Sequence, residues 1–209
     1  MKILVTGSAG FIGYHFTKSL LVNGNEVLGI DNLNDYYDPT LKQARLNNLT
    51  PYSNFSFEKI DIANNKSLKG SFELFNPRMV VHFAAQAGVR HSIENPYSYL
   101  DANLTGFLNI LELCRHNNKV EGLIYASSSS VYGANTKMPC STVDRTDQPI
   151  SLYGATKKAN ELMAHAYSYL YGLHTTGLRY FTVYGPWGRP DMAMYIFLDK
   201  ILKGESIPV

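Results

Sequence analysis

Cysteine is scarce in this sequence of 209 residues, which contains only Cys114 and Cys140. Two cysteines so far apart form no disulfide framework and no metal-binding spacing, and this suits a reducing compartment. The six histidines are dispersed, with no H-E-x-x-H motif and no cysteine partner. We therefore expect the histidines to be structural, and we predict no metal site.

Long apolar runs and basic runs are also missing. No segment approaches the roughly 20 apolar residues of a membrane span, and the N-terminal apolar run stops at a glycine turn, too short for a secretory signal. The 19 Lys and Arg residues are scattered and nearly balanced by 17 Asp and Glu. We expect a cytoplasmic globular protein of one large domain or one and a half, with neither a membrane nor a nucleic acid as partner.

The sequence does have a glycine-rich turn between a short strand, Lys2 to Thr6, and a stretch from Tyr14 to Asn23 with helical apolar spacing. In such a turn the glycines let the backbone approach a pyrophosphate, and the helix N-terminus offers free N–H groups and a positive dipole. No Gly-Lys-Ser/Thr follows, so this is not a Walker A loop. The pattern predicts a dinucleotide site, although a plain turn is the alternative. The turn contains Gly7, Gly10, Phe11, Ile12 and Gly13.

The next expected strand, Glu26 to Ile30, ends in Asp31. An acid at a strand end, about 20 residues past the glycines, accepts hydrogen bonds from the adenosine ribose hydroxyls and repels a 2′-phosphate. No arginine lies within the next dozen residues to attract such a phosphate. The pattern favours NAD over NADP, and a turn or capping role for Asp31 is the alternative.

Apolar strands alternate with helical stretches through the rest of the chain. This alternation predicts an α/β fold, a Rossmann-type doubly wound parallel sheet with helices on both faces. Ligands of such sheets gather at the carboxyl ends of the strands. Five candidate residues fall at such ends: Gly7, Asp31, Asp61, Ala84 and Ser127. Further strands are expected at 55–60, 79–83, 122–126 and 175–181, and further helices at 39–48, 64–75, 96–116, from 151 and at 192–203.

A cluster of four serines, Ser127 to Ser130, follows one of these strands, and Tyr153 and Lys157 come about 25 residues later. If Ser151 begins a helix, Tyr153 and Lys157 share one face of it, one turn apart. A lysine beside a phenol stabilises the phenolate, lowers its pKa from about 10, and makes it an acid or base near neutral pH. A surface Tyr and Lys on an amphipathic helix is the alternative. No G-x-S-x-G motif supports a serine hydrolase.

Together, T-G-x-x-G-x-x-G, Asp31, the serine cluster and Tyr153-x-x-x-Lys157 resemble the extended short-chain dehydrogenase/reductases that act on nucleotide sugars. Four stretches, 31–38, 84–90, 127–133 and 179–192, resemble more narrowly the UDP-glucuronate 4-epimerases. The resemblance covers essentially the whole chain, and that family continues well beyond residue 209. It implies an NAD-binding domain at 1–181 that holds the catalytic residues. It also implies an incomplete start of the substrate region at 182–209, with the small C-terminal substrate region largely absent.

The resemblance implies NAD as cofactor and a UDP-sugar as substrate, most closely UDP-glucuronate, converted to UDP-galacturonate through a 4-keto sugar. Tyr153 would take the proton of the C4 hydroxyl with the help of Ser128, while Lys157 lowers the pKa of Tyr153 and holds the nicotinamide ribose. The substrate contacts implied are Arg90, Ser128, Thr182 and Arg189. The cofactor contacts implied are Gly7, Gly10, Phe11, Ile12, Gly13, Asp31, Asn32, Asp61, Ile62, Ala84, Ala85, Gln86, Asn103, Tyr153, Lys157 and Tyr180.

Other members of the superfamily remain as alternatives. Nucleotide-sugar 4,6-dehydratases carry Asp and Glu where this chain has Ser129 and Ser130, and UDP-glucuronate decarboxylases usually carry Glu in place of Ser130. Epimerisation needs no such acid. A 4-epimerase of another UDP-hexose, these two enzymes, and an NAD-binding module without catalysis all stay open. The resemblance also implies a homodimer, paired through the helices that begin near Pro96 and Ser151.

Overall fold

The computed structural model describes residues 1–207, which form a six-stranded sheet with the order β3-β2-β1-β4-β5-β6. All five neighbouring strand pairs run parallel. This arrangement confirms the predicted fold class, and the observed strand ends lie within two residues of the expected ones. The strands are β1 (Lys2–Thr6), β2 (Glu26–Asp31), β3 (Phe55–Lys59), β4 (Met79–His82), β5 (Gly122–Ser128) and β6 (Thr175–Tyr180).

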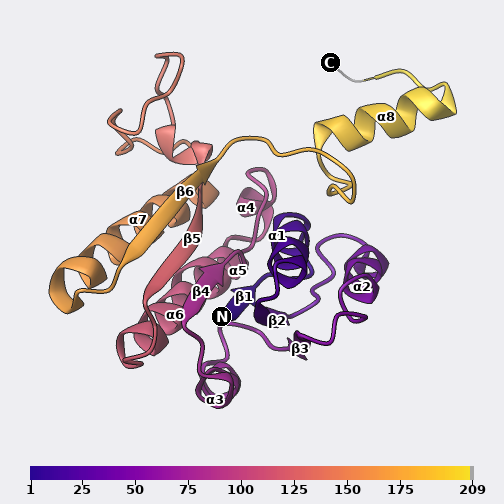
Figure 1. The fold of residues 1–209 in the computed structure, drawn as a ribbon. Helices are drawn as coiled ribbons and strands as arrows, with labels where there is room; N and C mark the ends of the chain where they lie inside the picture. Colours follow the sequence, from indigo (N-terminus) through magenta and orange to yellow (C-terminus); the bar gives the residue numbers. More distant parts are fainter. Residues whose placement is uncertain (208–209) are drawn as a thin grey trace.

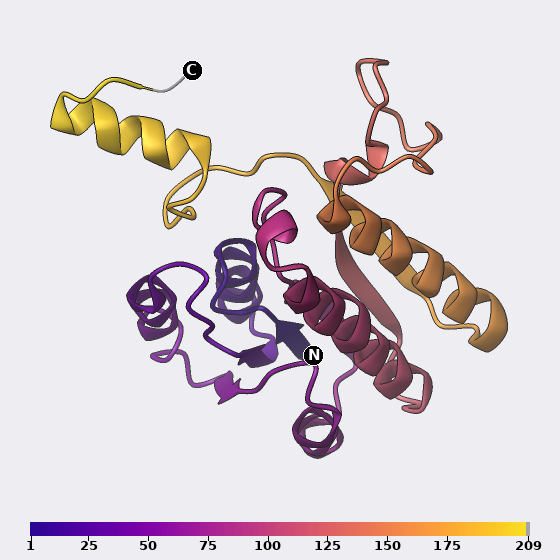
Figure 2. The same ribbon diagram turned by 180° about the vertical axis from the view of Figure 1, so that it is seen from behind.

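Helices cover both faces of the sheet (Figures 1 and 2). One apolar core joins α1 and α2 to the sheet through side chains such as Leu21, Leu46 and Val81. The other joins α3, α6 and α7 to the opposite face, where Phe72 and Phe107 are fully buried. The covering helices are α1 (Phe11–Val22), α2 (Pro39–Asn47), α3 (Asn65–Phe75), α6 (Gly106–Arg115) and α7 (Leu152–Tyr171).

The helical stretch expected at 96–116 is confirmed, but it is not a regular α-helix throughout. After the short α4 (His91–Glu94), the chain forms α5 (Pro96–Tyr99) and continues through a π-helical turn, η1 (Leu100–Thr105), directly into α6. The π-helical turn directs the buried side chain of Asn103 toward Gln86. The Oδ1 of Asn103 accepts the backbone N–H of Gln86 at 2.8 Å. Inserted π-turns of this kind are frequent at functional sites.

After β6 the chain leaves the sheet and runs to α8 (Ala193–Lys203), which lies apart from the other helices in Figure 1. No residue of α8 is buried, and its apolar side chains, such as Leu198 and Leu202, are exposed. The end of the predicted 182–209 region, residues 208 and 209, lies outside the described residues. Within residues 1–207, no helix has the length and apolar character required to span a membrane.

Candidate active site at the carboxyl edge of the sheet

A cavity opens where the strands end, bordered by the glycine-rich turn, the segments that follow β2, β3, β4 and β6, and the start of α7. Most of the residues predicted from the sequence line it. These are Gly7, Gly10, Phe11, Ile12, Gly13, Asp31, Asn32, Asp61, Ile62, Ala84, Ala85, Gln86, Tyr153, Lys157 and Arg189.

At Gly7 and Gly13 the glycine-rich turn has room for backbone only. Gly7 has a φ of +72°, and a Cβ atom there would lie 2.6 Å from the backbone nitrogen of Ala84. A Cβ on Gly13 would lie 2.0 Å from the carbonyl oxygen of Gly7. The turn therefore packs directly against the end of β4 and the start of α1. Because Gly10 on the cavity wall also lacks a side chain, the backbone there is open to a pyrophosphate.

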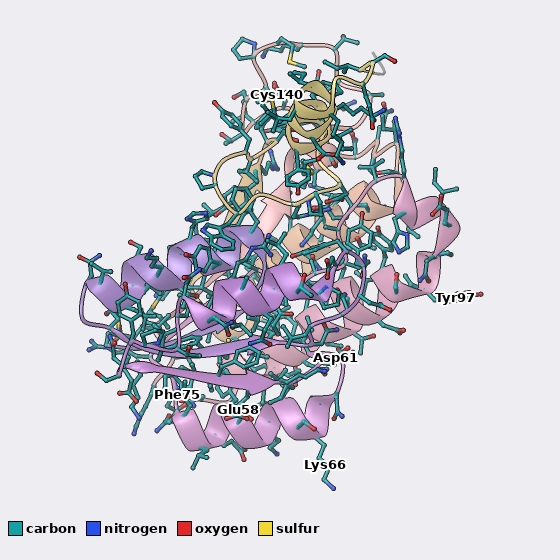
Figure 3. All side chains as sticks on the ribbon, turned by 90° about the vertical axis from the view of Figure 1, so that its right-hand side faces the viewer. Glu58, Asp61, Lys66, Phe75, Tyr97 and Cys140 are labelled. Atoms are coloured by element: carbon teal, nitrogen blue, oxygen red, sulfur yellow. The ribbon has the colours of Figure 1, made fainter. Side chains whose placement is uncertain are left out.

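The carboxylate of Asp31 is buried at the end of β2 and orders the turns around it. Its Oδ2 accepts the N–H of Ala9 at 3.2 Å, and its Oδ1 accepts the N–H of Leu33 at 2.9 Å. Each carboxylate oxygen can accept a second hydrogen bond. Asp61 follows β3 (Figure 3) and its Oδ2 accepts the side-chain N–H of Asn32 at 2.9 Å. The acceptors thus suit ribose hydroxyls, so this half of the cavity fits a dinucleotide.

Asn103 does not line the cavity, although the sequence predicts it as a cofactor contact. It is buried behind the wall, where its Nδ2 donates to the carbonyl of Gln86 at 3.1 Å and to Thr156 Oγ1 at 3.1 Å. Asn160 on α7 in turn donates to the carbonyl of Asn103 at 2.6 Å. Asn103 therefore fixes the segment after β4 and links it to α7.

The expected start of α7 is confirmed. Ser151 caps the helix, its Oγ accepting the N–H of Gly154 at 3.0 Å, and Tyr153 and Lys157 both line the cavity from one helix face. Ser128 ends β5, and its Oγ accepts the N–H of Ser130 at 3.1 Å as the cap of a short 3₁₀ turn, η2 (Ser129–Tyr132). Ser128 is buried and does not itself line the cavity.

The expectation that Lys157 lowers the pKa of Tyr153 is not met in this structure. Burial raises the pKa of Tyr153, and the nearby Ser128 side chain and the charge of Arg189 only partly oppose it. The Lys157 ammonium donates to the carbonyl of Ala126 at 2.9 Å, and burial lowers its pKa to about 8. The phenol of Tyr153 is therefore protonated at neutral pH. The pKa of Lys157, about 8, lies close to neutral pH.

Arg189 is the predicted substrate residue that reaches the cavity. Its Nε and Nη2 bind the Oδ1 and Oδ2 of Asp191 at 3.0 and 2.5 Å, and the hydroxyl of Tyr36 donates to the same carboxylate at 3.0 Å. The cavity wall includes neither Arg90 nor Thr182, which are both exposed.

Tyr180, predicted as a cofactor contact, also lies outside the cavity wall. It ends β6 beside Ser128, and its ring lies 6.2 Å from that of Phe83.

Sequence reasoning missed several lining residues, among them Tyr36, Tyr37 and Lys42. The polar and aromatic run at 31–38 was a signal for the two tyrosines. Lys42 gave no signal, because only the folding of α2 against β2 brings it to the cavity. Its Nζ donates to the carbonyl of Asn34 at 2.9 Å, and burial lowers its pKa.

Comparisons with known proteins show the family of this chain. Residues 3–209 match the NAD dependent epimerase/dehydratase family. Protein CapI of Staphylococcus aureus is 57% identical over 209 residues, which are 100% of this chain and 62% of CapI. UDP-glucuronate 4-epimerase 3 of Arabidopsis thaliana is 55% identical over 208 residues, which are 100% of this chain and 48% of that protein.

Among solved structures, the UDP-glucuronic acid 4-epimerase from Bacillus cereus in complex with UDP-glucuronic acid and NAD matches with a TM-score of 0.91 and 37% identity. The match covers 99% of this chain and 65% of that one. A Rossmann-type sheet with a glycine-rich turn and a Tyr-x-x-x-Lys pair at one cavity defines a class of dinucleotide-dependent enzymes. The chain belongs to the NAD dependent epimerase/dehydratase family, which confirms the predicted resemblance. It spans about half to two thirds of the length of the curated relatives named above.

Proposed function

We propose that the whole protein is an NAD-dependent 4-epimerase of a UDP-sugar, with UDP-glucuronate as the substrate. The observation that carries the proposal is the convergence of Tyr153, Lys157 and Arg189 on the cavity that also contains the glycine-rich turn. The relatives named UDP-glucuronate 4-epimerase support the same substrate. A 4-epimerase of another UDP-hexose is the second candidate, because this chain covers only part of such enzymes.

The cofactor contacts follow from the fit of the cavity. The glycine-rich turn and the N-terminus of α1 bind the pyrophosphate, and Asp31 accepts hydrogen bonds from the adenosine ribose. Asn32, Asp61 and Ile62 lie beside this position on the cavity wall. NAD, when bound, supplies reversible oxidation at C4 of the sugar.

Tyr153 and Ser128 handle the proton of the sugar hydroxyl at C4. The phenolate form of Tyr153 accepts this proton as the hydroxyl becomes a ketone, and the resulting phenol returns it when the hydroxyl forms again on the other face of the ring. Ser128, whose side chain lowers the pKa of Tyr153 and therefore lies near it, binds the same sugar oxygen. Lys157, one helical turn away and cationic below about pH 8, lines the same cavity and binds the ribose that carries the nicotinamide.

Arg189 gives the cavity a cation that suits the carboxylate of a glucuronate. Ser129 and Ser130 occupy the positions at which the dehydratases and decarboxylases of this superfamily carry acidic side chains. A serine hydroxyl cannot carry out the proton transfer that those acids perform. Epimerisation is the reaction that needs only the groups present. We assign 1–181 to cofactor binding and catalysis, and 182–209 to the start of the substrate region.

We also propose a homodimer. The helical segments α5 to α7 expose large apolar side chains, which is typical of an interface. Tyr97, for example, points away from the molecule (Figure 3). Light scattering at micromolar concentration should give twice the monomer mass. The side chains concerned are Tyr97, Leu100, Leu108, Leu162 and Tyr169.

The test of the reaction is Tyr153→Phe, which removes one hydroxyl and keeps the ring. Turnover should fall at least about 100-fold, because the group that transfers the proton is lost, while the Kd for NAD stays within about twofold. Tyr171→Phe is the matched control, because Tyr171 is an exposed tyrosine at the far end of the same helix. Turnover that survives in Tyr153→Phe would refute the assigned role.

A further inference from the structure

Arg45 on α2 is among the largest fully buried side chains of the protein, with 0% exposure. An arginine stays charged when buried, so its N–H groups need strong acceptors. Within residues 1–207, none of the hydrogen bonds of Arg45 goes to a carboxylate. The side chain is therefore held by neutral oxygen atoms. The segments that supply these oxygen atoms indicate the role of Arg45.

The guanidinium of Arg45 joins three segments that are distant in the sequence. Nη1 donates to the carbonyl of Ala9 in the glycine-rich turn at 2.9 Å and to the hydroxyl of Tyr37 at 2.6 Å. Nε and Nη2 both donate to the carbonyl of Trp187, at 3.2 and 2.7 Å. One buried cation thus ties the cofactor half of the cavity to the turn that follows β6.

The turn at Trp187 needs such support, because Trp187 has a φ of +64°. This conformation is costly for a bulky residue and persists only where the surroundings impose it. Besides Arg45, the ring nitrogen Nε2 of His15 lies 2.8 Å from the carbonyl of Pro186, and the ring of Tyr14 lies 6.0 Å from that of Trp187. All of these supports come from α1 and α2, whereas α8 after the turn buries no residue.

Arg189 follows Trp187 by two residues and lines the cavity together with Tyr153. We propose that Arg45 is a positioning residue that holds the Trp187 turn and thereby sets Arg189 for the anionic group of the sugar. The part that concerns the sugar rests on the proposed function. The part that concerns the turn rests on the contacts of Arg45 alone, so the two can be tested separately.

The turn has its own reporter, because Trp187 is the one tryptophan of the 209-residue sequence and is 39% exposed. Arg45→Met should shift its fluorescence emission to longer wavelength and raise its acrylamide quenching about twofold, since two hydrogen bonds to its carbonyl are lost. Arg45→Lys should restore part of the wild-type signal. Arg78→Met is the matched control. Arg78 is exposed and pairs with Glu121 just before β4 and β5 begin, at the opposite end of these strands from the cavity.

An unchanged tryptophan signal in a folded Arg45→Met protein would overturn the proposal. If circular dichroism shows that Arg45→Met does not fold, His15→Ala gives the same test, since it removes the exposed contact with Pro186. It should change the emission in the same direction by a smaller amount. No change in His15→Ala and in Arg45→Lys would equally overturn the role of these contacts.

The consequence for Arg189 is measured by the binding of UDP-glucuronate and UDP-glucose in the presence of NAD. Arg45→Met should weaken UDP-glucuronate about tenfold and UDP-glucose less than about twofold, because one charge-assisted contact is lost for the acid alone. Arg45→Lys should weaken UDP-glucuronate by less. Adding Arg189→Gln to Arg45→Met should weaken UDP-glucuronate no further. An equal loss for both sugars would make Arg45 merely structural. A wild-type protein without preference for UDP-glucuronate would refute the proposed substrate, and the fluorescence result would still decide the role of Arg45 in the turn.

Discussion

The two walls of the cavity are built in different ways. On one wall, from Gly7 to Asp31, the backbone itself forms much of the surface, and its close contacts lie within the first strand, turn, helix and strand and against the backbone that follows β4. On the other wall, around Trp187 and Arg189, the chain has left the sheet and is held by side chains from remote helices. The shape of the first wall requires that its glycines have no side chain. The shape of the second wall requires hydrogen bonds from particular side chains.

This difference predicts opposite sensitivities to mutation. A single added methyl group should damage the glycine wall, because its atoms are already in contact and cannot move without shifting β4 or α1. The Trp187 wall should tolerate added atoms and should respond to the removal of a remote hydrogen-bond donor such as Arg45. The predictions that follow begin with the largest expected effect.

Gly13→Ala should break the first wall. The added Cβ would lie 2.0 Å from the carbonyl oxygen of Gly7, so the turn or the helix must shift. We expect the free energy of unfolding to fall by about 3 kcal/mol and NAD binding to be lost. Urea unfolding and titration with NAD measure the two effects.

Gly70→Ala is the matched control for that substitution. Gly70 lies within α3 with open space around its Cβ position, so this change should be neutral or should stabilise the protein by about 0.5–1 kcal/mol. A Gly13→Ala protein as stable as Gly70→Ala would contradict the account of the glycine wall.

Lys157 lines the same cavity from α7 and should make stability depend on pH. Its pKa in the folded protein is about 8, below the ordinary 10.5, so between these values the unfolded chain binds more protons. Stability should therefore rise with pH across this window, by about 2 kcal/mol from pH 7 to 9.5. Lys157→Met should lack this rise, and denaturant unfolding at both pH values measures it. Equal slopes in the two proteins would show that Lys157 is not the group concerned.

Asp31→Asn should give the smallest of these effects. It keeps the shape of the side chain and removes the charge, so the Kd for NAD should rise about tenfold. The preference for NAD over NADP should fall, because a 2′-phosphate is no longer repelled. Asp35→Asn, at an exposed position nearby, is the control. Unchanged cofactor preference in Asp31→Asn would argue against the placing of the adenosine ribose.

The contrast between the walls also explains what could be predicted from the sequence. The strands, the glycine-rich turn and the cap at Ser151 depend on local patterns, and they were predicted almost to the residue. The π-turn at Asn103 was not, because it is imposed by Gln86 and Thr156 from other elements. Contacts between such distant residues leave no regular pattern in the sequence, so they could not be predicted from it.

Arg45 and Lys42 were missed for the same reason. They look like ordinary polar residues of a surface helix, and only the packing of α2 against the sheet buries them. The pKa of Tyr153 was expected to fall beside Lys157, but burial outweighs the other influences and raises it. Desolvation depends on the whole fold, so the spacing of Tyr153 and Lys157 in the sequence could not predict it.

Proton NMR of UDP-glucuronate incubated with the protein and NAD tests the central claim most directly. The account predicts that the anomeric signal of UDP-galacturonate appears and that it is missing with Tyr153→Phe. The 209-residue chain and a protein that extends to the full length of its relatives should be compared, because the chain spans only 62% of CapI. An extended, NAD-bound protein that leaves UDP-glucuronate unchanged while it interconverts UDP-glucose and UDP-galactose would contradict the account.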